Sequence, residues 1–522
     1  MNTRAQRRRL AWSTAIFSAA TGLSRALGLV REIVAANYFG ARGSINAFTV
    51  AFQIPNLIRA IVADAALSSA FVPVFSELLE KGERARAWRV ASTVFWLFLL
   101  VVGGITALFI LLAPVLIPPL TGAYDDLAVT LSQILFPIVI LIGLFGIVTG
   151  ILNSYDQFTI PALTPVFWNL AIIVGLVVGV PRADTADGKL YVYAGSIVVG
   201  TLIQFLLPLP WLRGLDGRLR LALDIRDPAV RQVFKLMVPV MLGLGLINVN
   251  AVIGTVVASK WIDPTIAPNA IDKAFRVYML PQGMFSVAVA TVLYPSLARL
   301  ATRGDMDGFR DTVTRGLRQI NFLLLPAAAA SIVLAEPIIR LLYERGAFDP
   351  DETTVVAQCL AAFSIGLTFN GMMLMLNRAF FSLQSPWVPT AIAVVNLVLN
   401  VVLYAAFERL GAWGIPLAIS IANIAGFALL ALTLRHRVGS LDVIGTATAF
   451  VRVLLASVVL GGVAYGVWRA LDDVLGRSFA SQLISVSAAL VAGAAAYLIA
   501  AWLLRVRELA AVLSLRSRTA RS

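Results

Sequence analysis

Long, uninterrupted apolar segments run through almost the whole chain and constrain its fold more than any other feature. A helix that crosses a bilayer needs about 20 mostly apolar residues. Inside a bilayer only helices or closed barrels satisfy every backbone hydrogen bond, and these segments lack the alternation of apolar and polar residues that membrane barrels show. Only 13% of the 522 residues are charged, about half the share found in soluble domains. The sequence therefore predicts an all-α polytopic membrane protein.

Fourteen such segments lie between polar or Pro/Gly breaks, and the sequence predicts about 14 transmembrane helices. In the first half of the chain they lie at about Ala11–Asn37, Ile45–Phe75, Trp88–Ile117, Leu127–Asn153, Pro161–Val180 and Leu190–Leu212. In the second half they lie at about Val230–Lys260, Asn269–Ala298, Phe309–Ile338, Thr353–Phe381, Pro386–Phe407, Gly411–Leu434, Thr446–Trp468 and Phe479–Leu504.

The formal net charge is +14, and many of the basic residues lie in alternate loops between the apolar segments. One set of loops holds the runs Arg7–Arg9, Lys81–Arg89, Arg213–Arg226, Arg299–Arg315, Arg435–Arg437 and Arg505–Arg518. Several of the loops between them are acidic: Asp125–Asp126, Asp184–Asp187 and Asp349–Glu352. Loops rich in Lys and Arg stay on the cytoplasmic side of a membrane. The pattern predicts that both termini are cytoplasmic, favours an even helix count and argues against nucleic acid as a partner.

The two halves share a weak internal repeat at an offset of about 225 residues. Ala47–Val50 resembles Ala274–Val277, and two further matches follow in the same order. Chance similarity between apolar segments is the alternative interpretation. An even number of helices in each copy makes the repeats parallel, a common transporter plan with the substrate site near mid-membrane. The repeat predicts two six-helix bundles, residues 1–226 and 227–440, followed by two extra helices and a basic cytoplasmic tail in residues 441–522.

Four arginines lie inside the predicted membrane helices: Arg25, Arg31, Arg59 and Arg276. An arginine at mid-helix costs about 2.5–3.5 kcal/mol on insertion scales, and such residues usually face a bundle interior or a wet cavity. The carboxylates of Glu32 and Asp64 accompany them. The set predicts a cationic cavity for a phosphate or pyrophosphate, which arginine binds through its bidentate fork. Two alternatives stay open: an internal ion pair between Glu32 and either Arg25 or Arg31, and an Arg276 side chain that reaches the outer interface.

Helix geometry limits how the first two arginines are used. Arg25 and Glu32 are seven residues apart and share a face, whereas Arg31 lies about 120° round the helix. A straight helix therefore cannot direct both guanidinium groups at one point. A bend near Gly22 or Gly28 would bring the two together.

The most specific motifs of the chain are Ser24–Gly28, Arg31–Glu32 and Ala47–Arg59, and the stretches Gly150–Ala162 and Tyr294–Leu297 add to them. Together they resemble the MurJ/MviN family of lipid II flippases, within the multidrug/oligosaccharidyl-lipid/polysaccharide exporter superfamily. The likeness covers nearly the whole chain, and its first two helices are the most specific part.

The resemblance implies a transporter rather than an enzyme. Such a protein flips the undecaprenyl-pyrophosphate-linked peptidoglycan precursor, lipid II, from the cytoplasmic to the outer leaflet of the bacterial inner membrane by alternating access. It thereby serves cell wall biogenesis and cell shape. The implied partners are lipid II, membrane lipids and the cell wall synthesis machinery, and no cofactor is implied. The implied substrate-binding residues are Arg25, Arg31, Arg59, Arg276, Glu32, Asp64, Ser24 and Asn46.

Several positions depart from the family pattern, among them Gln53, which replaces a frequent lysine. Asn46 stands where the family often has aspartate, and Glu32 stands where aspartate is usual. Asp64 is followed by alanine, where glutamate followed by glycine is more usual. Asn46 bears on the substrate, because a requirement for aspartate at this position in every family member would argue against transport of lipid II.

The energy source stays open between the membrane potential and a monovalent cation. Four asparagines offer a weak candidate cation site: Asn248, Asn250, Asn396 and Asn400. This set lacks a carboxylate, so hydrogen bonds between helices are the favoured interpretation of these side chains.

Two other functions remain as alternatives. A flippase for another polyprenyl-pyrophosphate-linked oligosaccharide would need the same cavity, whereas a cation-coupled drug exporter would favour acidic residues over arginines. The single Cys359 and the single His436 cannot build a Cys/His metal site. Without a nucleophile–base pair, the sequence does not predict an enzyme.

Overall fold

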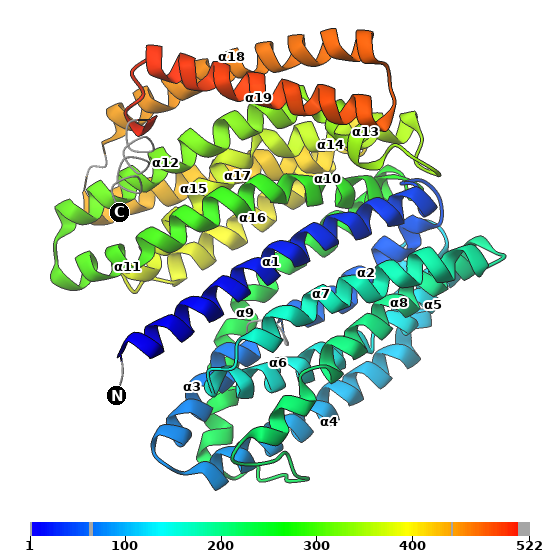
Figure 1. Cartoon of the computed structure of the whole chain (residues 1–522), viewed down its shortest axis with the longest axis vertical. Coiled ribbons are helices and arrows are strands. Elements are labelled where there is room, and N and C mark those ends of the chain that lie inside the picture. The colour runs from blue at the N-terminus through cyan, green and yellow to red at the C-terminus, as the bar shows by residue number, and fades with distance from the viewer. Residues whose placement is uncertain (1–2, 62–65, 440–441, 510–522) are drawn as a thin grey trace. The chain divides into compact units, whose positions relative to one another are not determined.

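The computed structural model describes residues 3–61, 66–439 and 442–509, and every regular element in these ranges is a helix (Figure 1). Ten of the described helical segments are long and apolar enough to cross a membrane, or eleven if one bent pair forms a single span. The prediction of an all-α, multi-span membrane protein is therefore confirmed. The count of fourteen stays a prediction, because α1, α2, α3 and α9 fall outside this set.

Contacts between Cα atoms divide the chain into two compact units, Met1–Pro268 and Asn269–Ser522. The helices of the first unit are α1 (Thr3–Phe39), α2 (Ile45–Arg59), α3 (Ala66–Glu80), α4 (Arg84–Leu116), α5 (Asp125–Leu135), α6 (Ile138–Ser154), α7 (Thr159–Val174), α8 (Ala186–Leu206) and α9 (Pro228–Val257). The second unit is built from α10 (Ala267–Pro281), α11 (Val287–Arg303), α12 (Met306–Val333), α13 (Ala335–Tyr343), α14 (Pro350–Ile365), α15 (Leu367–Ser382), α16 (Trp387–Ala406), α17 (Gly414–Val438), α18 (Val443–Leu475) and α19 (Phe479–Leu503).

Helix α9 packs with α2, α3 and α4 in the first unit. The predicted repeat places residues 227–440 in the second bundle. The boundary from the repeat therefore differs from the boundary between the two packed units, which lies after Pro268. The boundary at 226/227 is a prediction about the repeat, which packing does not test.

Several predicted helices are interrupted in the structure. The segment predicted at Leu127–Asn153 consists of α5 and α6, which meet at Pro137, a residue that cannot donate a backbone hydrogen bond. The segment predicted at Thr353–Phe381 consists of α14 and α15, which are bent by 44°. At this bend, the Gly366 amide donates to Ser420 Oγ at 3.0 Å. A Cβ atom on Gly366 would lie 2.6 Å from Ser420 Cα, so only glycine allows α17 to approach this closely.

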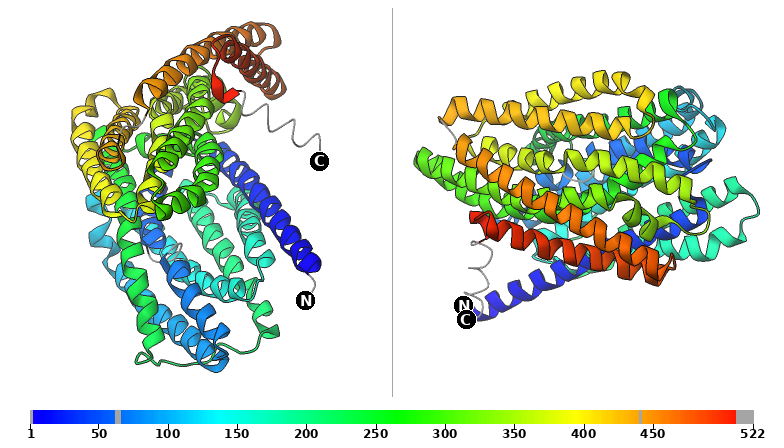
Figure 2. Two further views of the ribbon diagram at one scale, coloured as in Figure 1. Left: turned by 90° about the vertical axis from the view of Figure 1, so that its left-hand side faces the viewer. Right: turned by 90° about the horizontal axis from the view of Figure 1, so that it is seen from above.

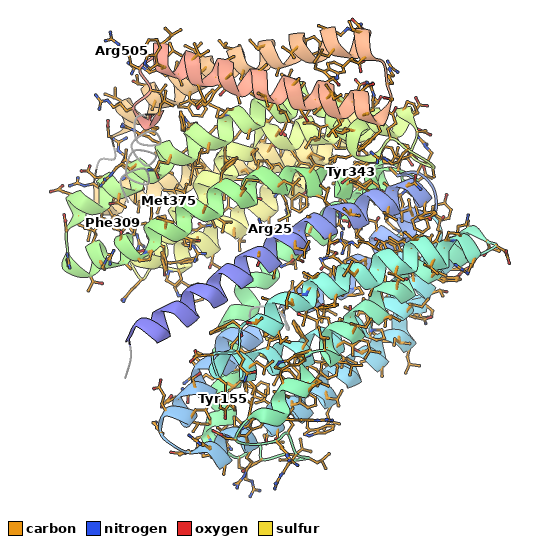
Figure 3. All side chains as sticks on the ribbon, in the orientation of Figure 1. Arg25, Tyr155, Phe309, Tyr343, Met375 and Arg505 are labelled. Carbon is orange, nitrogen blue, oxygen red and sulfur yellow. The ribbon has the colours of Figure 1, made fainter. Side chains whose placement is uncertain are left out.

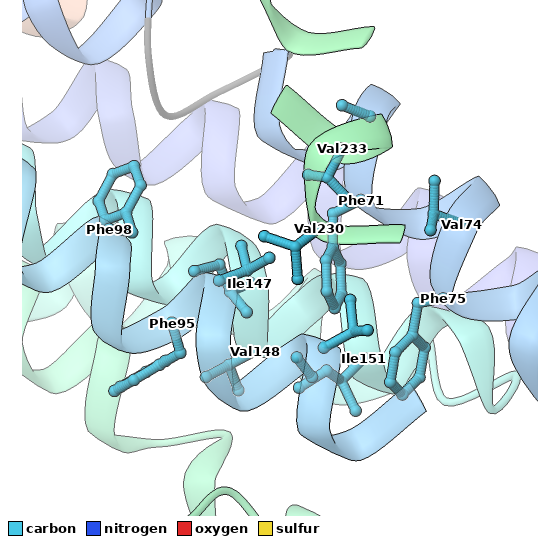
Figure 4. Packing of buried hydrophobic residues seen from close by; sticks show 14 of the residues in the cluster. Phe71, Val74, Phe75, Phe95, Phe98, Ile147, Val148, Ile151, Val230 and Val233 are labelled. Atoms are coloured by element: carbon cyan, nitrogen blue, oxygen red, sulfur yellow. The ribbon is translucent and has the colours of Figure 1, made fainter. Parts of the chain in front are cut away.

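Aromatic and branched aliphatic side chains pack together in one core cluster of the first unit (Figure 4). Phe71 and Phe75 of α3 are fully buried and stack on each other with ring centroids 5.2 Å apart. Trp88 of α4 meets Phe75 edge to face, and Ile147 of α6 packs in the same cluster. Burial of this kind fixes α3, α4 and α6 against one another.

In the second unit, the last two helices pack along each other and against α12 (Figure 2). The Tyr497 hydroxyl donates to the Phe322 carbonyl at 2.7 Å, which ties α19 to α12. Asp472 of α18 accepts a hydrogen bond from Gln482 of α19 at 2.5 Å and lies 3.8 Å from Arg340 of α13. These buried polar contacts attach both helices to the rest of the unit.

The start of α9 is fixed by a carboxylate with two partners. Asp227 caps the helix, accepting from the Ala229 amide at 2.8 Å. It also accepts two hydrogen bonds from the Arg86 guanidinium, at 3.0 and 2.9 Å. The Arg86 side chain and the helix amide hold the pKa of Asp227 below its usual value.

We predict that Asp227→Ala lowers the stability of the detergent-solubilised protein by about 0.5–2 kcal/mol, the usual range for a lost N-cap. Because the folded-state pKa of Asp227 is lowered, its contribution is present above the unfolded pKa and is lost as the pH falls through the folded pKa. Thermal unfolding of wild type and variant at neutral and acidic pH measures both effects. Asp216→Ala is the matched control, since the Arg84–Asp216 pair is more exposed. Equal losses in the two variants would contradict the assignment.

Candidate functional site

The arginines of α1 differ in their surroundings. Arg25 is exposed, and among the described residues it has no ion pair or hydrogen bond (Figure 3). Arg31 is nearly buried, with 11% of its side chain exposed, and its Nη2 lies 2.6 Å from Glu32 Oε1. Of the two pairings left open by the sequence, Glu32 therefore makes the one with Arg31. The positive charge of Arg25 has no carboxylate to offset it within the described part of the chain.

Helix α7 supplies two further partners of Arg31, Trp168 and Asn169, which the sequence motifs do not single out. The guanidinium carbon of Arg31 lies 4.7 Å from the centroid of the Trp168 ring, a cation–π geometry. Arg31 Nη1 also donates to Asn169 Oδ1 at 3.2 Å. The Asn169 amide nitrogen donates to the backbone oxygen and Oγ of Ser24 at 3.3 and 3.4 Å. One asparagine therefore links two of the predicted site residues on α1.

A polar residue in an apolar helix was the available signal for Asn169. Such residues in membrane segments usually face a helix bundle and bond to a neighbour. The partners lie 138 and 145 residues away in sequence, so the motif alone could not identify them.

Arg59 ends α2, and its guanidinium donates to Asn56 Oδ1 at 3.2 and 2.8 Å. Asn56 is three residues earlier, on the same helix face. Asp64, the predicted carboxylate of this region, lies outside the described residues.

In the second unit, Arg276 pairs with Asp272 one turn earlier on α10. Arg276 Nε lies 2.7 Å from Asp272 Oδ2, and 36% of the arginine side chain is exposed. The spacing of four residues was the signal for this pair. Arg276 has further contacts, and the pairing partly offsets its charge.

Asn46 is buried and holds two loops of the first unit together. Its amide nitrogen donates to the carbonyl oxygens of Thr265, Ala41 and Gly43 at 2.6, 2.9 and 3.1 Å. The Gly43 amide donates to the same Thr265 oxygen at 2.7 Å. An aspartate could not donate these hydrogen bonds when ionised. The amide of Asn46 therefore suits the three carbonyl groups that surround it.

The four asparagines of the candidate cation site fall into two pairs, one in each unit. Asn248 and Asn250 of α9 are half-buried, while Asn396 and Asn400 of α16 are buried. The Oδ1 atoms of the second pair accept no hydrogen bond from a described residue. Within the described ranges, no three His, Cys, Asp or Glu residues gather as metal ligands.

Comparison with known proteins identifies relatives over most of the chain. The family model described as "Lipid II flippase MurJ" matches residues 35–479. A curated relative from Burkholderia cenocepacia, named "Lipid II flippase MurJ", is 31% identical over 468 residues, which cover 87% of this chain and 88% of that protein.

Solved structures show the same fold. A structure titled "Lipid II flippase MurJ, inward closed conformation" has a TM-score of 0.77 at 26% identity, covering 94% of this chain and 99% of that one. An inward-facing multidrug resistance MATE family transporter of the MOP superfamily has a TM-score of 0.67 at 18% identity. It covers 82% of this chain and 98% of its own, and this likeness concerns the fold alone.

We predict that Asn46→Asp destabilises the protein by about 1–3 kcal/mol, because an ionised carboxylate would face three carbonyl oxygens in a buried site. Asn46→Ala removes the donor without adding a charge and is the comparison. Thermal unfolding in detergent at neutral pH measures both. An Asn46→Asp protein that is as stable as wild type would show that the donor role of this amide is unimportant.

Proposed function

The chain belongs to the MurJ family of lipid II flippases, and on that premise we propose that its intramembrane arginines bind the pyrophosphate of the lipid. The chain is a lipid II flippase, a transporter and not an enzyme. It moves the lipid-linked precursor of peptidoglycan across a membrane in which it is a multi-pass protein. The proposal concerns the residues that hold the head group during this movement.

The observation that carries the proposal is the uncompensated charge of Arg25. A guanidinium within a membrane helix costs about 2.5–3.5 kcal/mol unless a partner or water offsets it. Arg25 is exposed and has no carboxylate among the described residues, whereas Arg31 is paired with Glu32. A pyrophosphate supplies the missing negative charge and accepts two parallel hydrogen bonds from an arginine.

Arg31, in this proposal, is a fixed member of the site. Glu32, Asn169 and Trp168 hold its guanidinium in one geometry, so binding of an anion costs little further side-chain entropy. The offset provided by Glu32 also keeps the site from binding the pyrophosphate so tightly that release becomes slow.

The remaining proposed members are Arg59, Arg276, Ser24, Asn46 and Asp64. Of these, Asn46 acts through the loop that it holds at the start of α2, since its amide is occupied by backbone carbonyls. Arg59 and Arg276 are half-buried beside their partners, Asn56 and Asp272.

The number of transmembrane helices and their grouping into bundles are part of the same proposal. Fourteen transmembrane helices in two parallel six-helix bundles, with α18 and α19 outside them, would expose the site alternately to each side of the bacterial inner membrane. Both termini would be cytoplasmic, as the basic loops indicate. Outward movement of an anion is favoured by about 2.3 kcal/mol per charge per 100 mV at an inside-negative potential. We therefore propose the membrane potential as a driving force and leave a coupling cation as the second candidate.

The test of the transported substrate is replacement of an essential lipid II flippase in a depletion strain. We expect the wild-type chain to restore growth, and Arg25→Ala to fail at the same membrane level, because the site loses an anion contact worth about 2 kcal/mol or more. Arg315→Ala is the control, since Arg315 is exposed on α12 and lies outside the proposed site. Failure of the wild-type chain would favour a different polyprenyl-pyrophosphate substrate. Equal rescue by both variants would contradict the role of Arg25.

We further predict that Asn169→Leu lowers the rate of lipid II transport about tenfold, because Arg31 loses one of its supports. A positioning role predicts that Asn169→Asp, which keeps an acceptor for Arg31, retains more activity than Asn169→Leu. Transport by purified protein in vesicles measures the rates, and thermal unfolding identifies a purely structural loss. If both variants unfold alike and transport alike, Asn169 does not position Arg31.

A further inference from the structure

The segment between α8 and α9, residues 211–226, combines exposed apolar and basic side chains and has no part in the proposed transport step. We propose that this segment docks on the surface of a bilayer that contains anionic phospholipids. The occupant is the headgroup layer of the membrane in which the protein sits, with apolar side chains inserted and arginines on the phosphates. The proposal is independent of which lipid the protein transports.

The first observation is the exposure of large apolar side chains in a loop. Leu221 is 82% exposed, Leu223 51% and Ile225 54%, and Trp211 nearby is 44% exposed. The backbone from residue 217 to residue 224 forms neither helix nor strand, so these exposed apolar side chains do not belong to the apolar face of a packed element. Three large apolar side chains within five residues are thus exposed together, and water alone would be an unfavourable neighbour for them.

The second observation is the charge beside these apolar side chains. Four arginines of the segment are exposed and have no carboxylate partner among the described residues: Arg213, Arg218, Arg220 and Arg226. Two of the three acidic residues nearby are already engaged, Asp216 with Arg84 at 2.9 Å and Asp227 with Arg86 at 2.9 Å, which leaves the Asp224 carboxylate beside four arginines. The segment therefore keeps an uncompensated positive charge next to exposed leucines.

The third observation is that α4 holds the segment rigidly. The Arg220 amide donates to Ser92 Oγ at 3.0 Å, and the Asp224 amide donates to Thr93 Oγ1 at 3.1 Å. Trp96 Nε1 donates to the Arg220 carbonyl oxygen at 2.9 Å. A pre-ordered segment binds without first losing backbone entropy.

Gly217 allows the segment to lie this close to α4. A Cβ atom at Gly217 would be 2.2 Å from Trp88 Cδ1, so the backbone lies directly on the indole ring. One side of the segment at Gly217 thus packs against α4, and the opposite side is available to contact the membrane surface.

Adjacent arginines and leucines distinguish a membrane surface from other partners. Interfacial segments place apolar side chains at the boundary of the acyl chains and basic side chains among anionic headgroups. A nucleic acid would use the arginines but leave the leucines in water. The segment joins α8 of a multi-pass membrane protein to α9, so a bilayer surface is its constant neighbour. Each basic residue near such a surface strengthens binding roughly fivefold.

The experiment places an environment-sensitive fluorophore at position 221 of the full chain, using Leu221→Cys in a Cys359→Ala background. The protein is reconstituted in vesicles of phosphatidylcholine alone and of equal parts phosphatidylcholine and phosphatidylglycerol. We expect a quencher carried on the lipids to quench the label severalfold more in the vesicles that contain phosphatidylglycerol. Salt should reduce this difference in quenching between the two vesicle types. Asp307→Cys, in the first turn of α12 and with a side chain that is 88% exposed, is the control label and should stay in water.

The role of charge is tested in the labelled protein. Changing Arg218, Arg220 and Arg226 to Gln should remove most of the dependence on phosphatidylglycerol, while changing Arg299, Arg303 and Arg315 to Gln should leave it intact. The proposal is wrong if iodide in the water quenches the label equally in both vesicles. It is also wrong if the label is protected from iodide equally in both vesicles.

Discussion

The cost of a guanidinium in hydrocarbon is the constraint on which the polar interior of the first unit depends. Arg31 meets that cost within the protein, through Glu32, Asn169 and the face of Trp168. Arg25, on the same helix, does not meet it with any described residue. One helix thus presents one arginine that is held by neighbouring side chains and one that is not, and the proposed anion site uses both.

The class of protein follows from the sequence because an apolar run of bilayer length is the property that a membrane-spanning helix requires. Where the helices break is harder to predict, since a break depends on neighbours that are distant in sequence. Pro137 marks one interruption by its own chemistry. The bend at Gly366 is different, because its cause is Ser420 on another helix, which no local pattern reveals. The packing of α9 on α3 is likewise a tertiary fact.

For the candidate site, too, some features can be predicted from the sequence and others depend on residues distant in the chain. Arginines are rare in apolar membrane segments, so the candidate anion-binding arginines can be identified from the sequence alone. Their partners across helices cannot be identified in this way, as the contact between Arg31 and Asn169 illustrates. The sequence presents Asn46 only as a departure from a family aspartate, whereas the structure shows the three carbonyls that its amide serves. A residue that differs from the one common in its family can therefore fit the hydrogen-bonding groups that surround it in this protein.

The close approach at Gly366 has a consequence for how this protein can change over evolution. Because a Cβ on residue 366 would lie 2.6 Å from the Cα of Ser420, any larger side chain there requires α17 to move. The Ser420 hydroxyl also donates to the Ala362 carbonyl and accepts from the Gly366 amide. Residues 366 and 420 are therefore coupled, and a tolerated replacement at one should be accompanied by a compensating replacement at the other. Homologous sequences should record this pair as correlated substitutions.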